Sequence, residues 1–176
     1  MTEQPQWYAI RVTYSREVKL KQYLDSINIK SFIPMHYVEV VRKGRKCKVV
    51  TPVVHNLIFI FSIRKVLDRI KQELSFKIPI RYIMDKAAKQ PIVVPEKDMS
   101  HFIAVSGTLD ERLLFLTKVE PILKQGTLVK ITGGIFAGVE GRVVRIKKDR
   151  RVMVEIDGLI AVVTAFIDPL LLTSID

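Results

Sequence analysis

Five cations fall within seven residues in the first half of the chain, and their type and spacing suit the binding of phosphate. They are Arg42, Lys43, Arg45, Lys46 and Lys48. A glycine stands among them and β-favouring residues flank them, so the sequence predicts a two-stranded hairpin with a basic tip. Such a tip can contact the phosphate backbone of DNA without reading its sequence. A turn that its charge merely keeps solvated is the alternative, and the sequence leaves both interpretations open.

No pattern in the sequence points to catalysis. The three histidines, His36, His55 and His101, are scattered and have no Glu or Cys at ligand spacing. No glycine-rich loop carries a Lys-Ser/Thr pair, and no Gly-x-Ser-x-Gly occurs. Cys47 is the single cysteine, which excludes an internal disulfide and makes no metal site. We therefore expect a protein that is not an enzyme and that uses no cofactor and no metal.

The net charge of +11 is unevenly distributed. Residues 1–115 carry a net +9, whereas residues 125–176 carry a net +1. A positive first part is typical of a protein that works beside nucleic acid, because phosphate neutralisation releases counterions. The nearly neutral second part argues against a purely electrostatic RNA clamp there.

A second basic turn is present in the C-terminal part, and its surroundings are mixed. Its cations are Arg145, Lys147, Lys148, Arg150 and Arg151, and acidic residues lie close by at Asp149, Glu155 and Asp157. The mixed field favours a solvated hairpin, with contact to RNA or to a ribosomal protein as the alternative.

Length and hydropathy allow one medium domain or two small ones. The chain has 176 residues, of which 48% are hydrophobic, enough for real cores. Its longest apolar runs, such as 57–61 and 159–163, are too short to cross a bilayer, and the N-terminus lacks the layout of a signal peptide. We expect a cytoplasmic protein without membrane contact.

The order of the predicted elements indicates an α+β fold. In the first part we expect a split β-α-β, RRM-like antiparallel sheet with helices. The expected strands are 7–12, 32–41, 47–54, 56–61, 80–84 and 90–94, and the expected helices begin near Ser15, Val66 and Pro95. Residues 106–124 lose this periodicity and read as a linker or a frayed helix. The predicted domains are therefore 1–105 and 125–176, with the linker between them.

The C-terminal part is rich in glycine, and the spacing of its glycines is informative. Five of the eight glycines lie between Gln125 and Ile146. The pattern Gly134-x-Phe136-x-x-x-x-Gly141, followed by a β-branched strand, resembles the KOW motif of transcription elongation factors and some ribosomal proteins. Further turns predict a small SH3-like barrel of about five strands. We expect the glycines to set turn geometry and Phe136 to pack the barrel.

The first part resembles the N-terminal (NGN) domain of the NusG family of transcription elongation factors. The resemblance rests on Trp7-Tyr8-Ala9-Ile10-Arg11-Val12 followed by a helix, on Ile33-Pro34 before the basic hairpin, and on Gln90-Pro91-Ile92 before the third helix. A KOW element after a linker completes it. The resemblance implies binding to the clamp helices of the largest RNA polymerase subunit. It also implies that the basic hairpin touches upstream or nontemplate DNA through backbone contacts.

Two departures from the family pattern resemble the specialised paralogues of the UpxY and RfaH kind. Val54-His55-Asn56-Leu57 stands where the family usually has Phe-Pro-Gly-Tyr. Asp157 stands where the housekeeping factor has an aromatic residue that helps to engage termination factor Rho. The resemblance therefore implies antitermination at selected operons, such as capsule or surface polysaccharide operons, with weak or no Rho binding.

Docking on polymerase requires an apolar patch left open on the first domain. The candidates are Tyr14, Leu57, Phe59 and Tyr82. Because the faces of a sheet alternate, roughly half of such a set belongs to the core. The barrel is a candidate site for a ribosomal protein.

Two rival functions remain. One is a housekeeping NusG-type elongation factor, against which Asp157 and the lost Pro-Gly argue. The other is a KOW-type RNA-binding protein of the ribosome or translation apparatus. That rival calls for a basic barrel, which the net charge of residues 125–176 does not supply.

Overall fold

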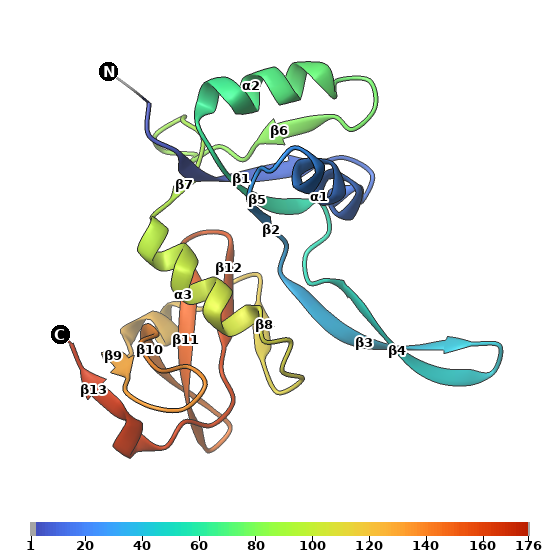
Figure 1. Ribbon diagram of the computed structural model, residues 1–176. Coiled ribbons are helices and arrows are strands. Elements are labelled where there is room, and N and C mark those ends of the chain that lie inside the picture. The colour runs from blue at the N-terminus through green and yellow to red at the C-terminus, as the bar shows by residue number, and fades with distance from the viewer. Residues whose placement is uncertain (1–2, 176) are drawn as a thin grey trace. The chain divides into compact units, whose positions relative to one another are not determined.

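The computed structural model describes residues 3–175, and the chain divides into two compact units (Figure 1). One unit combines the chain up to Pro34 with Val54–Glu96. The other combines Met35–Val53 with the chain from Lys97 onward. The basic hairpin and nearly all of the third helix therefore belong to the same unit as the C-terminal strands.

The first unit is an antiparallel sheet with two helices. Its strands run in the order β2-β5-β1-β6, and β7 also pairs with β1. The elements are β1 (Gln6–Val12), α1 (Glu17–Ser26), β2 (Ser31–Phe32), β5 (Leu57–Ser62), α2 (Arg64–Glu73), β6 (Ile80–Tyr82) and β7 (Val93–Val94).

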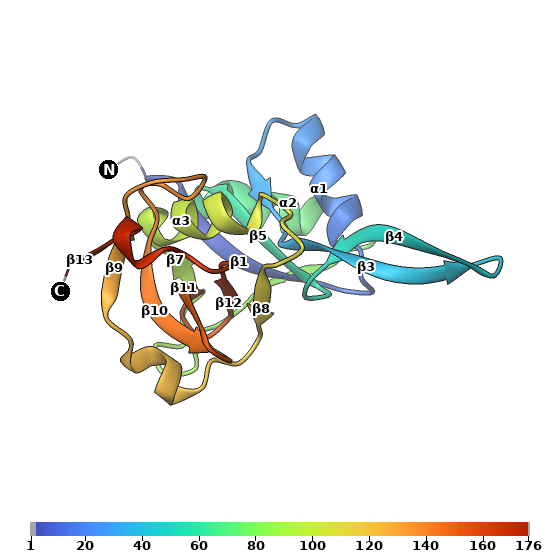
Figure 2. The same ribbon diagram turned by 90° about the horizontal axis from the view of Figure 1, so that it is seen from below.

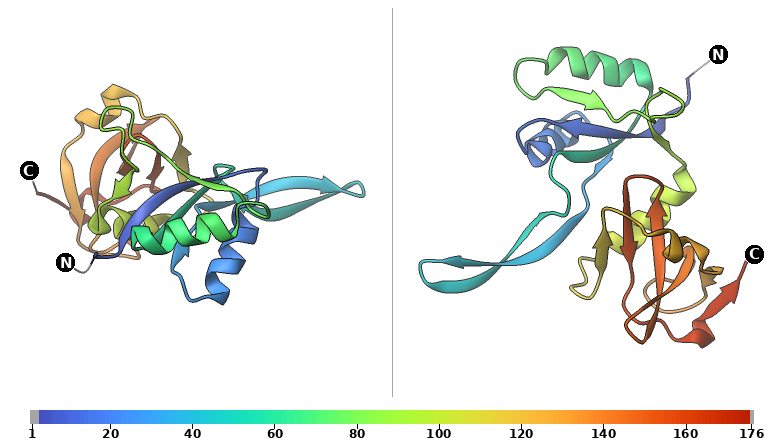
Figure 3. Two further views of the ribbon diagram at one scale, coloured as in Figure 1. Left: turned by 90° about the horizontal axis from the view of Figure 1, so that it is seen from above. Right: turned by 180° about the vertical axis from the view of Figure 1, so that it is seen from behind.

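The register of β1 against its neighbours divides the side chains of this sheet into two faces. Ile10 lies opposite Ile58 on β5 and opposite Tyr82 on β6, so these three residues share one face. Figure 3 shows α1 and α2 along the sheet, and a hydrogen bond from Tyr82 to Asp68 of α2 identifies the face that this helix covers. Apolar residues at helical spacing, such as Leu20 and Leu24, are fully buried, which is why these amphipathic segments fold as packed helices.

The second unit contains a hairpin that pairs only with itself. Strands β3 (Met35–Arg42) and β4 (Arg45–Pro52) form a two-stranded sheet, which Figure 2 shows as a long twisted ribbon. Its base contacts the strand that contains Phe115, and the rings of His36 and Phe115 lie edge to face with centroids 6.2 Å apart.

The rest of the second unit is α3 with a small barrel-like sheet of six antiparallel strands. The strand order is β13-β9-β10-β11-β12-β8. The elements are α3 (Glu96–Ser106), β8 (Leu114–Leu116), η1 (Pro121–Gln125), β9 (Leu128–Ile131), β10 (Glu140–Ile146), β11 (Asp149–Ile156), β12 (Ile160–Val163), η2 (Pro169–Leu171) and β13 (Leu172–Ser174). Both faces of β11 are buried, since Val152, Met153 and Val154 are all nearly inaccessible to solvent.

Two glycines of this sheet have clear structural reasons. Gly134 has a φ of +77°, a conformation that side chains with a Cβ disfavour. A Cβ on Gly141 would lie 2.4 Å from the carbonyl oxygen of Met153, so only glycine lets β10 approach β11 so closely here. Phe136, which lies between these two glycines in the sequence, is buried.

The predicted fold class, a split β-α-β sheet followed by a small β-barrel, is confirmed. Several details differ from the prediction. The strand expected over 32–41 is divided into β2 and β3, and the barrel-like sheet has six strands and not about five. The segment expected to be a linker or frayed helix contributes β8, which pairs with β12 because that strand has a free edge. The strands expected over 80–84 and 90–94 are shorter and are joined by a single bridge between Met84 and Pro91.

Candidate nucleic-acid interface

The tip of the β3–β4 hairpin is a tight turn that presents cations. Lys43 and Gly44 form its two-residue loop with φ values of +50° and +74°, the pattern that matches the twist of a two-stranded ribbon. The loop is closed by Arg42 directly opposite Arg45. Like charges opposite each other destabilise a strand pair, so this tip carries an electrostatic cost that a bound polyanion would remove.

The five predicted cations separate into two groups. Nζ of Lys46 lies 2.8 Å from Oε1 of Glu39 on the neighbouring strand. Lys48 lies 2.6 Å from Glu111, and the hydrogen bond with this carboxylate raises the pKa of Lys48 above its usual value. The side chains of Arg42, Lys43 and Arg45 form no hydrogen bond or ion pair with any residue in the range 3–175. The unneutralised charge is therefore concentrated at the tip.

The hairpin also carries apolar side chains that we did not single out in the sequence. Tyr37, Val41 and Val50 lie on one face and are exposed, while Val38 and Val49 lie opposite each other on the other face. The alternation of more exposed and less exposed positions along β3 is the feature that could have identified them. A ribbon with apolar side chains behind a cationic tip can contact protein along its length and phosphate at its end.

The four candidates for polymerase binding do not form one surface. Leu57 and Phe59 share a face of β5 and are 4% and 0% exposed. Tyr82 belongs to the opposite face, as its pairing with Ile10 shows. Tyr14 lies beyond the end of β1, is 81% exposed, and has a φ of +58°.

Tyr82 is held in place by polar contacts to α2. Its hydroxyl donates a hydrogen bond of 2.8 Å to Asp68. Burial, and then this hydrogen bond, raise the pKa of Tyr82 well above its usual value. Its ring also packs edge to face on Tyr8, with centroids 5.7 Å apart. These contacts give Tyr82 a role inside the first unit.

A buried carboxylate lies beside the unusual His55. Glu17, at the start of α1, is 1% exposed, and its Oε1 lies 3.5 Å from Nδ1 of His55. Its Oε2 has no hydrogen-bond partner among the residues that the structure describes. A buried carboxylate with one weak partner is costly, and sequence reasoning gave no sign of it because a glutamate in a first helical turn is ordinarily solvated.

Asp157, from which we expected weak Rho binding, is held by Lys124 of η1. Its carboxylate and that of Glu155 each lie 2.9 Å from Nζ of Lys124. The hydrogen bond from Lys124 holds the pKa of Asp157 below its usual value. Lys124 was not among our candidates, since nothing in its sequence neighbourhood marks it.

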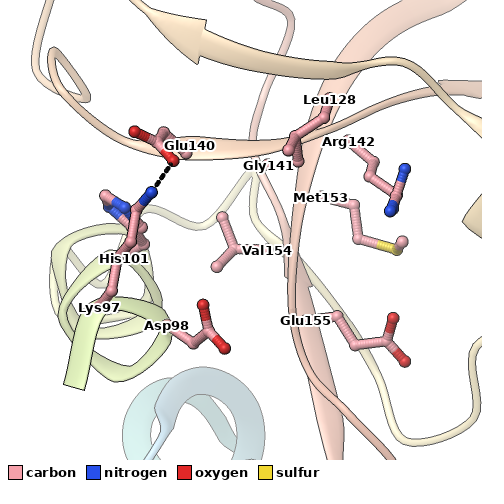
Figure 4. A pocket seen from close by; sticks show the side chains of 10 residues that line it. All are labelled: Lys97, Asp98, His101, Leu128, Glu140, Gly141, Arg142, Met153, Val154 and Glu155. Atoms are coloured by element: carbon pink, nitrogen blue, oxygen red, sulfur yellow. Dashed lines mark ion pairs between the residues drawn. The ribbon is translucent and has the colours of Figure 1, made fainter. Parts of the chain in front are cut away.

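A hollow of about 290 Å³ lies between α3 and the barrel strands of the second unit (Figure 4). Lys97 of α3 lies 2.5 Å from Glu140 of β10. His101 faces the same hollow, and burial lowers its pKa. The lining mixes both signs of charge and includes Asp98, Arg142 and Glu155, so it shows no preference for one kind of ligand.

Two classes of site are missing from the described part of the chain. No group of three or more His, Cys, Asp or Glu side chains within residues 3–175 is arranged to hold a metal ion. No helix in the same range is long and apolar enough to span a membrane.

These features define the class of protein. A split β-α-β sheet and a small barrel do not by themselves define a function, but a cationic ribbon tip can contact phosphate, and two family models match the chain. The family model described as transcription termination factor nusG matches residues 5–103, which is more than half of the 176 residues, and the KOW motif model matches residues 125–157. No curated protein matches the chain.

The chain belongs to the NusG family. It is a NusG-like transcription factor of the elongation and antitermination class, and the general partner of that family is RNA polymerase. The two matched ranges lie inside the predicted domains 1–105 and 125–176, whose boundaries remain a prediction.

Proposed function

We propose that this protein is a specialised antitermination factor that rides on RNA polymerase in the cytoplasm and suppresses pausing or termination at selected operons. Capsule or surface polysaccharide operons are the first candidates, by analogy with the paralogues that the sequence resembles. The mechanism is steric and allosteric and involves no chemical turnover. We divide the chain into an NGN domain over 1–105, a linker over 106–124 and a KOW domain over 125–176.

The observation that carries this proposal is the cationic tip of the β3–β4 hairpin. Arg42, Lys43 and Arg45 have no counter-charge within the described residues, and two of them face each other across the ribbon. A polymerase-bound factor can direct such a tip at upstream duplex DNA or at the nontemplate strand. Lys46 and Lys48 are paired with carboxylates, so we assign them a supporting part in the contact.

We assign polymerase docking to the sheet face that carries Leu57 and Phe59, with the exposed Tyr14 at its rim. Both residues of β5 are buried in this structure, so docking requires a rearrangement that exposes this face. Tyr82 lies on the opposite face. A single partner surface cannot contact Phe59 and Tyr82 together, and Tyr82 supports the fold under this assignment.

We infer from Asp157 that the barrel discriminates against Rho. A carboxylate held by Lys124 offers no apolar anchor, and losing an interface aromatic typically costs about 2 kcal/mol or more of binding free energy. We therefore expect weak or no Rho binding, and a ribosomal protein is the candidate partner of the barrel.

The test compares two variants of equal charge change on elongation complexes made with polymerase from the native cell. One variant is Arg42→Ser/Lys43→Ser/Arg45→Ser. Its matched control is Lys19→Ser/Lys65→Ser/Lys86→Ser, which removes three exposed cations of the first unit. We expect the tip variant to lose about tenfold in retention at moderate salt and to lose pause suppression, because it forfeits phosphate contacts.

Equal behaviour of the two variants would contradict DNA contact by the tip. Phe59 is fully buried, so the docking assignment is tested at the exposed Tyr14. Tyr14→Asp should reduce co-purification with polymerase while the protein stays folded, and full retention would overturn that docking assignment. Mapping of bound genomic DNA after affinity purification decides the remaining point. Enrichment over a few operons supports a specialised factor, uniform enrichment supports the housekeeping rival, and ribosomal subunits alone support the translation rival.

A further inference from the structure

The loop between β1 and α1, residues 13–16, has an unusual backbone conformation. Tyr14 and Ser15 have φ values of +58° and +50°, a region that residues with a Cβ occupy rarely. Asn56, directly before β5, has a φ of +66°. Strained backbone of this kind persists only where surrounding contacts hold it, and it is typical of functional sites. The strain at Tyr14 and Ser15 therefore requires contacts that hold the loop.

Backbone acceptors fix the two ends of this loop. At its start, the N–H of Val12 donates to the carbonyl oxygen of Asn56 over 3.0 Å. At its end, Nη1 of Arg16 donates to the carbonyl oxygen of Lys77 over 2.6 Å. These contacts lie on either side of the two strained residues and leave their conformation to be held by something else.

The side chain of Asn56 holds the middle of the loop. Its Oδ1 accepts a hydrogen bond of 2.7 Å from the backbone N–H of Ser15. Because asparagine tolerates positive φ better than most residues with a Cβ, it can take this backbone conformation and supply an acceptor as well. Glycine, which stands here in the family pattern, would take the same φ but has no side chain to offer Ser15. The departure from the family pattern therefore adds a contact that the usual residue cannot make.

The neighbouring departure from the family pattern contacts the same region. His55 stands where that pattern has proline, and its Nδ1 lies 3.5 Å from Oε1 of Glu17, the first residue of α1. Glu17 is buried and the side chain of His55 is largely exposed, so the contact joins a buried group to an exposed one. Its length marks a weak interaction. Asn56 is therefore the principal contact to the loop, and His55 is a secondary one.

Tyr14 projects from this loop. Its side chain is 81% exposed, and the guanidinium carbon of Arg16 lies 5.4 Å from the centre of its ring. A cation at this distance over an aromatic face is attracted to it, so the ring has a preferred direction on the surface. A side chain that is oriented before its partner arrives binds at a smaller entropic cost than a freely moving one.

We propose that Asn56 is a positioning residue, supported by His55, that holds the β1–α1 loop and presents Tyr14 in a fixed orientation to its protein partner. This inference rests on the proposed function, in which Tyr14 lies at the rim of the polymerase-docking face. It deepens that function by assigning a role to the two positions, 55 and 56, at which the chain departs from Pro-Gly. The partner surface that fits is an apolar slot for the ring with an acceptor for its hydroxyl.

The test separates the side-chain acceptor of Asn56 from its backbone conformation. Asn56→Gly keeps positive φ and removes the acceptor, whereas Asn56→Asp keeps an acceptor. In the free protein, amide hydrogen exchange of Ser15 should become about tenfold faster in Asn56→Gly and about twofold faster in His55→Ala. It should stay near its original rate in Asn56→Asp. The matched control is Asn28→Gly, the same change at another asparagine with positive φ.

Retention on elongation complexes made with polymerase from the native cell provides the second measurement. It should fall about fivefold in Asn56→Gly, because the loop must then be ordered during binding. Asn56→Asp and the control Asn28→Gly should be retained like the unmodified protein. In a Tyr14→Ala background, Asn56→Gly should cause no further loss, since a residue that acts through Tyr14 has nothing left to position.

Unchanged exchange of Ser15 in Asn56→Gly would overturn the inference, and so would equal losses of retention with and without the ring of Tyr14. Full retention of Tyr14→Ala would contradict the docking assignment and the inference together. A loss in Tyr14→Ala without a loss in Asn56→Gly would overturn the inference alone, so the two failures are distinguishable. If Asn56→Gly does not fold, as judged by circular dichroism, unchanged exchange and retention in His55→Ala would overturn the inference instead.

Discussion

The two basic turns of this protein share their local chemistry and differ in what stands behind them. Each places a lysine at positive φ in its loop and an Arg–Arg pair across its strands, at Arg42 with Arg45 and at Arg145 with Arg150. The β3–β4 ribbon has no third strand, whereas β10 and β11 are flanked by β9 and β12. An isolated hairpin is only marginally stable, so the ribbon can adapt to a partner, while the barrel turn is preorganised.

The comparison shows that charge clusters of similar composition can serve different contacts. A deformable ribbon with a cationic end suits a site whose geometry is set by a large complex. A rigid turn between the flanking strands β9 and β12 suits a partner that must order itself on the protein. Preorganisation of the binding surface lowers the entropic cost of such binding.

The largest expected effect comes from the scaffold under the barrel turn. Gly141→Ala should reduce the free energy of unfolding of the second unit by about 3 kcal/mol or more, because the new Cβ meets backbone that cannot yield. Gly44→Ala, at a φ of +74° with open space around it, should cost about 1 kcal/mol and only locally. Thermal unfolding by circular dichroism and hydrogen exchange of barrel amides measure both. Equal losses would show that the ribbon and the barrel fold as one cooperative element.

A smaller effect is expected from reversing one charge in each Arg–Arg pair. Arg145→Glu should stabilise the barrel by about 0.5 kcal/mol, since it replaces a repulsive cross-strand pair with an attractive one. Arg42→Glu makes the same change in the ribbon but should leave global unfolding unchanged and only slow hydrogen exchange near the tip. Arg42→Glu should also reduce retention on elongation complexes, because it removes a cation from the proposed DNA contact. Destabilisation by either would mean that the like-charged pair is not strained in the free protein.

The smallest effect concerns the ion pairs that flank the two turns, because exposed pairs contribute little. Lys124 holds the pKa of the Asp157 carboxyl below its usual value of 3.8. The ion pair therefore contributes fully to the free energy of unfolding above pH 3.8, and the contribution is lost as the pH falls through the pKa that Asp157 has in the folded protein. Glu111 raises the pKa of Lys48 above 10.5. This ion pair therefore contributes fully to the free energy of unfolding below pH 10.5, and the contribution is lost as the pH rises through the pKa that Lys48 has in the folded protein.

An NMR titration of the two side chains checks both directions. Acid should perturb resonances near Gly158 at the end of the barrel, and alkali should perturb the shaft of the ribbon. Lys124→Ala and Glu111→Ala should return the respective pKa values towards their usual range. An Asp157 that titrates normally in the unmodified protein would contradict the contact with Lys124.

Much of the fold could be predicted from the sequence because it depends on local periodicity. Alternation in β1 and the helical spacing of Leu20 and Leu24 indicated the first unit, and the glycines before β10 indicated the barrel. β8 could not be predicted, since three residues of the supposed linker become a strand only because β12 has an edge to receive them.

The candidate site was predictable in part for the same reason. A cluster of five cations is visible in the sequence, but its division into three free and two paired members depends on Glu39 and Glu111, of which the second is far away along the chain. The pairing of strands also decided that Tyr82 faces away from Phe59. A one-residue change of register would have placed them together, and the continuous apolar run of β5 has no alternation that would tell its two faces apart.

The sequence by itself determined which residues carry charge, which segments become strands or helices, and the family to which the chain belongs. These properties follow from side-chain chemistry and from periods of two or 3.6 residues. The tertiary structure alone decided which cations remain without a counter-charge and that Lys124 holds the carboxylates of Glu155 and Asp157. Those outcomes depend on contacts between residues distant in the sequence, and electrostatic energy depends on separation in space and not on separation along the chain.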